Sequence, residues 1–186
     1  VNTDQQGKVC IVSGEKGIGK TATFKKIFNQ CKSGEIKSTV TYIDTPAKTT
    51  TLPALEDLLK SHNVSTSVEQ ESSEISIPRV IILDNAQHLF LTAVGHLAAF
   101  DALLAIIRRT EGKVCWLIGI THLSWNYLRR ARPESTCALD TVHAQIWSQS
   151  EIRSLILSRH HKSGFRLTYE RIALSANSND IDALRT

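Results

Sequence analysis

The sequence lacks long apolar runs, methionine and closely spaced cysteine pairs. A membrane-spanning helix needs roughly 18 to 20 consecutive apolar residues, and no stretch of the chain approaches that length. We therefore expect a soluble domain without a membrane segment, and no basic-then-apolar leader opens the chain. Because methionine is absent, we also expect the chain to be a piece of a longer protein.

The four cysteines lie far apart in the sequence and form no C-x-x-C motif. Cys10 and Cys115 fall in apolar, strand-like runs, where a thiol packs as a small hydrophobe. This usage favours a reducing intracellular compartment, either cytoplasm or nucleus.

The composition is that of a globular domain. The chain has 186 residues, of which 41% are hydrophobic and 22% charged, with a formal net charge of +4. This length suits one domain of ordinary size with room for the start of a second. The positive charge suits a protein that binds anions, and it does not by itself indicate nucleic acid.

Hydrophobic periodicity predicts an alternation of strands and helices. The expected strands are residues 9–12, 39–43, 80–83, 114–120 and 142–146. The expected helices are residues 21–31, 52–60, 94–110, 126–132 and 152–161, with a helical pattern continuing toward residue 186. The polar segment 62–78 reads as a solvated loop. Such alternation predicts an α/β fold with a mostly parallel sheet covered by helices on both faces.

Ligands of parallel sheets bind beyond the carboxyl ends of the strands. Gly14, Asp44, Asp84 and Thr121 each follow an apolar run and should lie at that edge.

The strongest motif is G-x-x-x-x-G-K-T, between the first strand and the first helix. Its glycines let the backbone wrap a phosphate, and the helix N-terminus adds partial positive charge. Lys20 would reach the β- and γ-phosphates, and the Thr21 hydroxyl would contact Mg²⁺. The predicted ATP-binding residues are Gly14, Glu15, Lys16, Gly17, Ile18, Gly19, Lys20 and Thr21.

Asp84 ends the fully apolar run 80–83 and is the expected second magnesium residue. A carboxylate there can hold a hydrated ion at the mouth of the phosphate loop. An aspartate after a strand is usually a turn residue, so this assignment depends on the phosphate loop.

The motif 14–21, the run Val80-Ile-Ile-Leu-Asp-Asn85 and the polar strand end Thr121 together resemble the AAA+ and STAND P-loop ATPases over residues 8–165. The resemblance implies a three-layer fold with a five-stranded sheet in the order 5-1-4-3-2. It also implies a core over residues 1–147 and a partial helical lid over 148–186. Thr121, with His122 as the alternative, would be a sensor of the γ-phosphate.

The sequence departs from this family at Asn85, where AAA+ proteins usually carry glutamate. An amide cannot accept a proton from an attacking water as a carboxylate does, although it can orient the water. The sequence leaves three explanations open: a slow nucleotide switch, an engineered substitution, or help from Gln87, His88 or Glu15.

A basic segment follows the predicted sensor strand. Arg129, Arg130 and Arg132 lie where AAA+ proteins often present an arginine finger to a neighbouring subunit. Such a run is more often a solvated face, and it could also contact nucleic acid. Arg108 and Arg109 suit the last turn of their helix, and Arg185 is a weak candidate for a second sensor in the lid.

The sequence thus predicts an ATP-binding AAA+-like module with Mg²⁺, acting as an ATPase or ATP-dependent switch. It would drive conformational change or assembly with a macromolecular partner, DNA among the candidates, as a homo- or hetero-oligomer. The segments 42–46 and 84–89 also resemble AAA+ proteins of replication initiation and transposition. A non-hydrolysing switch or scaffold and a P-loop kinase remain the alternatives.

Overall fold

The computed structural model describes residues 9–64, 79–91 and 97–164. Its five strands form one sheet in which every neighbouring pair is parallel, in the order β2-β3-β4-β1-β5. The strands are β1 (Val9–Gly14), β2 (Thr39–Asp44), β3 (Arg79–Asp84), β4 (Val114–Thr121) and β5 (Asp140–His143). This order, given from the opposite edge, confirms the predicted 5-1-4-3-2.

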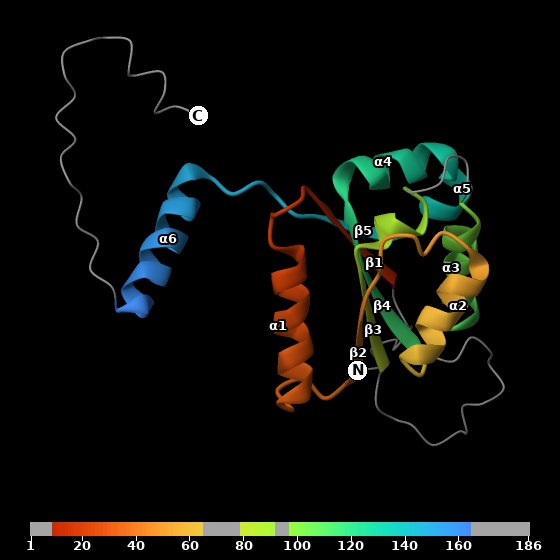
Figure 1. Cartoon of the computed structure of the whole chain (residues 1–186), viewed down its shortest axis with the longest axis horizontal. Coiled ribbons are helices and arrows are strands. Elements are labelled where there is room, and N and C mark those ends of the chain that lie inside the picture. The colour runs from red at the N-terminus through yellow and green to blue at the C-terminus, as the bar shows by residue number, and fades with distance from the viewer. Residues whose placement is uncertain (1–8, 65–78, 92–96, 165–186) are drawn as a thin grey trace, which may run out of the picture. The chain divides into compact units, whose positions relative to one another are not determined.

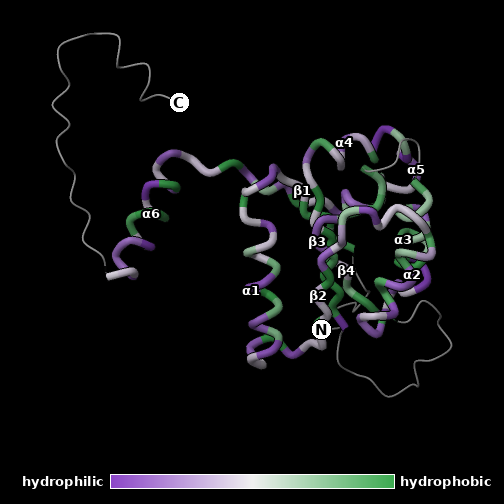
Figure 2. The backbone as a smooth tube through the Cα atoms, in the orientation of Figure 1, coloured by the Kyte–Doolittle hydropathy of each residue, from purple (hydrophilic) through white to green (hydrophobic). Residues whose placement is uncertain are grey.

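Helices lie on both sides of the sheet (Figure 1). Helix α1 (Lys20–Lys32) is on one side, and α2 (Leu52–Ser61) and α3 (Ala98–Arg109) are on the other. The remaining elements of this part are the 3-10 helix η2 (Ala86–Leu89), α4 (His122–Ala131) and α5 (Pro133–Thr136). Strands covered on both faces are apolar nearly throughout, and β3 and β4 are mostly hydrophobic in Figure 2.

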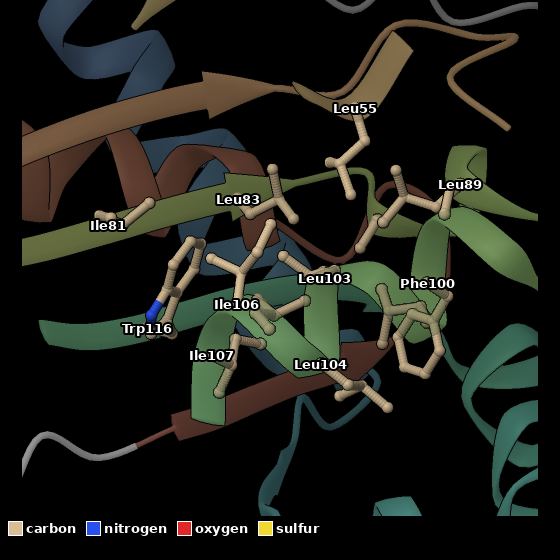
Figure 3. Close-up of a cluster of buried hydrophobic side chains, with 14 of the residues drawn as sticks. Leu55, Ile81, Leu83, Leu89, Phe100, Leu103, Leu104, Ile106, Ile107 and Trp116 are labelled. Atoms are coloured by element: carbon tan, nitrogen blue, oxygen red, sulfur yellow. The ribbon is translucent and has the colours of Figure 1, made fainter. Parts of the chain in front are cut away.

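The main core lies between the sheet and helices α2 and α3. Figure 3 shows Ile81, Leu83 and Trp116 of the sheet facing Leu55 of α2 and the apolar stripe of α3. Trp116 is fully buried, and its indole N–H donates to Thr110 Oγ1 at 3.0 Å, so its polar atom is satisfied. This packing fixes the strands whose ends carry the candidate site.

The predicted bounds of α4 and β5 were wrong. Helix α4 begins at His122 rather than 126, because the backbone turns into the helix directly after Thr121, which is still extended with ψ 150°. Strand β5 spans Asp140–His143 rather than 142–146. It is an edge strand, with Val142 54% and Ile146 77% exposed, so the alternation at 142–146 does not mark a buried face.

The chain divides into two compact units, residues 1–146 and 147–186. In the second unit, α6 (Gln149–Ser163) begins with a capping box: Glu151 N donates to Ser148 Oγ, and Ser148 N donates to Glu151 Oε2 at 2.7 Å. The predicted loop beyond residue 64, the start of the helix predicted at 94 and the tail with Arg185 lie outside the described residues. Among the described helices, none is both long and apolar enough to cross a bilayer.

Candidate functional site

Side-chain alternation places the polar strand ends on one face of the sheet. Tyr42 and Asp44 of β2 are register partners of Ile82 and Asp84 of β3, and partners on neighbouring strands point to the same side. Gly119 of β4 lies on that face as well, because a Cβ built there would meet Phe24 of α1 and Asp84. The carboxyl edge next to α1 therefore carries the candidate site.

The loop Gly14–Thr21 runs from the end of β1 into α1. Gly17 has φ 85° and Gly19 φ 105°, conformations that side chains with a Cβ rarely adopt. Gly14 is needed for a different reason, since a Cβ there would lie 2.8 Å from Ala144 Cβ. The glycines thus permit both the turns of the loop and its close approach to the chain after β5.

Lys20, the first residue of α1, directs its ammonium back over the loop. Its Nζ donates to Gly14 O at 2.7 Å and to Glu15 O at 2.9 Å. Partial burial lowers the pKa of Lys20, while the charges of Asp84 and Glu15 oppose that shift. The loop carbonyls thus hold the partly desolvated Lys20 ammonium against the loop.

Thr21 and Asp84 are brought together across 63 positions of sequence. Thr21 Oγ1 donates to Asp84 Oδ2 at 2.6 Å. Thr21 is exposed and Asp84 is fully buried, so the pair joins a solvent-accessible hydroxyl to a carboxylate inside the sheet edge. Mg²⁺ prefers oxygen ligands and uses one or two protein oxygens beside phosphate and water. The two predicted magnesium residues fit that ion.

The described residues contain no group of three or more His, Cys, Asp and Glu side chains that could hold a metal.

Tyr42 is a site residue that the sequence did not reveal. Its hydroxyl donates to Asp84 Oδ2 at 3.1 Å, and its ring packs on Phe28 of α1 with centroids 6.0 Å apart. Burial, followed by the charge and hydrogen bond of Asp84 and the charge of Asp44, raises the pKa of Tyr42. Tyr42 thus remains a protonated donor that holds the Asp84 carboxylate.

Asn85 adopts a left-handed backbone conformation, φ 58° and ψ 37°, directly after Asp84. Asparagine tolerates this region better than most residues. Its backbone N–H donates to Asp84 Oδ1 at 2.9 Å, and its side-chain Nδ2 donates to Asp44 Oδ1 at 2.8 Å. Asn85 therefore links the two carboxylates, contacting Asp84 through its backbone N–H and Asp44 through its side-chain amide.

The other residues considered for help at Asn85 occupy different positions. Gln87 is buried and its Nε2 donates to Asn85 Oδ1 at 3.2 Å. His88 Nδ1 lies 2.7 Å from Thr45 O, so this nitrogen carries the proton and donates. Glu15 is exposed on the loop.

Thr121 and His122 lie where β4 passes into α4. Thr121 is the register partner of Gly14, and its hydroxyl donates to Ser124 Oγ at 2.6 Å. His122 Nε2 lies 3.0 Å from Asn126 Nδ2, and its ring is 5.8 Å from that of His143. Both candidate sensors are therefore beside the loop, and each already has a polar neighbour on α4.

The three arginines after the sensor strand separate into two kinds. Arg132 pairs with Asp101 of α3 through Nη2–Oδ2 at 3.1 Å and Nε–Oδ1 at 3.2 Å, which raises the pKa of Arg132. Arg129 and Arg130 are exposed on α4. Arg108 and Arg109 lie in the last turn of α3, as predicted.

Comparison with known proteins agrees with this architecture. Residues 3–124 match the family described as AAA domain. No curated protein is similar enough in sequence to match.

Several solved structures share the fold. The Aeropyrum pernix ORC1 protein, solved in complex with DNA, matches with a TM-score of 0.57 and 17% identity, over 83% of this chain and 44% of that chain. The Aeropyrum pernix ORC2 protein, in its ADPNP-ADP complexes, matches with a TM-score of 0.59 and 17% identity, over 83% of this chain and 46% of that chain. Hsp104 of S. cerevisiae, in a casein complex, matches with a TM-score of 0.55 and 17% identity, over 86% of this chain and 28% of that chain.

These matches show an α/β P-loop fold of the AAA+ type. The chain spans less than half the length of each of these three structures.

Proposed function

The chain belongs to the AAA domain family, and from this premise we propose that it binds ATP together with Mg²⁺ at the edge of the sheet beside α1. The observation that carries the proposal is the convergence of the loop Gly14–Thr21, the Lys20 ammonium and the Thr21–Asp84 pair. The neighbour solved in ADPNP-ADP complexes supports it.

Each residue has a chemical role in this proposal. The loop amides and Lys20 hold the phosphates, and the start of α1 adds partial positive charge. Thr21 and Asp84 hold the magnesium ion, which when bound neutralises charge on the phosphate oxygens. Thr121, at the end of β4 beside Gly14, senses the γ-phosphate, with His122 as the alternative.

We propose that the bound ATP is hydrolysed by in-line attack of water, and that hydrolysis drives conformational change or assembly with a macromolecular partner. Residues 148–186 form the start of a helical lid in this proposal. A non-hydrolysing switch or scaffold is the alternative, and Asn85 is the observation that favours it, because its amide has no basic atom.

The first test measures ATP binding with and without Mg²⁺. A fluorescent ATP analogue should bind the natural chain more tightly in Mg²⁺ than in EDTA. Thr21→Ala removes the exposed hydroxyl of the Thr21–Asp84 pair. The ratio of the affinity in Mg²⁺ to the affinity in EDTA should then fall by about tenfold, equivalent to one charge-assisted contact.

Thr23→Ala is the matched control, because Thr23 is exposed on the same helix and its hydroxyl donates to Gly19 O rather than to Asp84. It should leave the magnesium advantage unchanged. Equal effects of the two substitutions would reject the metal role of Thr21, and the absence of any ATP binding by the natural chain would reject the proposed function.

DNA is the macromolecular partner we propose. Arg129 and Arg130 are exposed on α4, and neither is engaged in an ion pair among the described residues, in contrast to Arg132. The net charge of +4 and the neighbour solved in complex with DNA support this choice. The same two arginines are the candidates for a finger reaching the ATP of an adjacent subunit.

Binding of a labelled DNA duplex should weaken with added salt. Replacing both Arg129 and Arg130 by alanine should make the negative slope of log K against log salt less steep by about two. Each lost phosphate contact reduces the magnitude of that slope by roughly 0.9. Arg108→Ala with Arg109→Ala removes two exposed arginines from α3 and should change the slope little. If the slope stays the same in the α4 variant, these arginines do not contact DNA.

A further inference from the structure

A carboxylate lies beside the position where the expected acid is missing. Asp44, at the end of β2, accepts a hydrogen bond from Asn85 Nδ2 at 2.8 Å on its Oδ1. Asp44 is the register partner of Asp84, so its side chain is on the same face of the sheet as the magnesium pair. It is exposed to solvent, whereas Asp84 is fully buried.

Asp84 is unsuited to accept a proton from water. Its Oδ2 accepts from both Thr21 and Tyr42, and its Oδ1 accepts from the Asn85 backbone N–H. Three donors are thus directed at one buried carboxylate, and both of its oxygens accept hydrogen bonds. Residues 39–45 and 79–91, which form these two strand ends and the turns after them, contain no carboxylate other than Asp44 and Asp84.

Two neighbouring polar side chains also form hydrogen bonds at this edge. Asn85 Oδ1 accepts from Gln87, and an amide is not a base. His88 of η2 directs its protonated Nδ1 to the carbonyl of Thr45, which lies on the turn after β2. Asp44 Oδ1 accepts from Asn85, and no hydrogen bond to its Oδ2 is present among the described residues.

We propose that Asp44 is the general base for ATP hydrolysis, with its carboxylate on β2 replacing the one missing from β3. This inference rests on the proposed function. In the step, a water oxygen forms a bond to the γ-phosphorus and the bond from that phosphorus to the β–γ bridging oxygen breaks. The water proton passes to Asp44 Oδ2, and ADP and inorganic phosphate are the products.

Asn85 is a positioning residue in this arrangement. Its Nδ2 holds one oxygen of Asp44, and its left-handed backbone turns the amide toward β2. The amide and carboxylate of the pair could be exchanged between the two strands with their hydrogen bond preserved. That exchange provides the test.

The experiment measures single-turnover phosphate release from ATP with the whole chain in excess, alongside ATP affinity and thermal unfolding. Asp44→Asn keeps an oxygen that can accept from Asn85 but removes the base. Phosphate release should fall at least about 100-fold, the usual contribution of a general base. ATP affinity should change by less than about fivefold, as for an exposed charge.

The swapped variant, Asp44→Asn with Asn85→Asp, returns the carboxylate to β3, where aspartate tolerates the left-handed backbone. It should release phosphate at least about tenfold faster than Asp44→Asn alone, a partial recovery of the contribution of a base. Asp57→Asn is the matched control: Asp57 is an exposed carboxylate on α2, and its loss should leave the rate unchanged.

Three results would overturn the proposal. The first is a rate for Asp44→Asn close to that of the natural chain, and the second is a swapped variant no faster than Asp44→Asn. The third is a natural chain that binds ATP with Mg²⁺ but releases no phosphate. The third result leaves nucleotide binding intact, whereas failure to bind ATP would overturn the proposed function itself.

Discussion

Replacing Lys20 by alanine should weaken ATP binding at least about 100-fold, corresponding to the loss of roughly 3 kcal/mol of charge-assisted hydrogen bonding. The Lys20 ammonium is held above the loop by the carbonyls of Gly14 and Glu15. Partial burial removes part of the hydration of this charge and lowers the pKa of Lys20. A partly desolvated cation attracts phosphate more strongly than a fully hydrated one.

Isothermal titration calorimetry with ATP and Mg²⁺ would measure this change. Lys25→Ala is the control, because Lys25 is an exposed lysine of the same helix and changes the net charge equally. Equal losses in the two variants would mean that general charge, rather than the position of Lys20, controls affinity.

Replacing Gly119 by alanine should lower the free energy of unfolding by about 1–3 kcal/mol, the usual cost of overpacking. A Cβ on Gly119 would collide with the ring of Phe24 in α1 and lie 2.7 Å from Asp84 Oδ1. Phe24 and Asp84 are both buried, so neither side chain can move into solvent without disturbing its neighbours. The displaced carboxylate should also weaken the magnesium dependence of ATP binding.

Urea unfolding of Gly119→Ala, Phe24→Leu and the double variant would test the collision. The smaller leucine leaves room beside β4, so the double variant should lose less stability than the sum of the single losses. Additive losses would show that the Phe24 ring does not limit the space at Gly119.

The prediction of the fold succeeded where the pattern was strong and local. The apolar run of β3 is buried on both faces toward its end, whereas β1 and β4 are buried on one face and mostly half-buried on the other. Such runs bounded by turn residues are recognisable in sequence. The edge strand β5 and the start of α4 were misplaced. An exposed edge strand has no buried face to mark its register, and α4 follows Thr121 without an intervening turn.

The candidate site was only partly predictable for a related reason. Gly14–Thr21 is a contiguous motif whose glycine positions follow from backbone conformation, and Gly17 and Gly19 adopt the positive φ values that it requires. Tyr42 carried no such signal, because a tyrosine in a strand is ordinary. A glycine inside an apolar strand can mark a close approach, and Gly119 is such a glycine.

The sequence by itself determined the phosphate loop, the alternation of strands and helices, and the missing acid at Asn85, because each depends on neighbouring residues. Only the tertiary structure decided that Tyr42 and Thr21 hold Asp84 and that Asp44 lies against Asn85. These partners are 41 to 63 positions apart in the chain. They meet because parallel pairing of β2 with β3 aligns their carboxyl ends, and packing of α1 places Thr21 over the same edge.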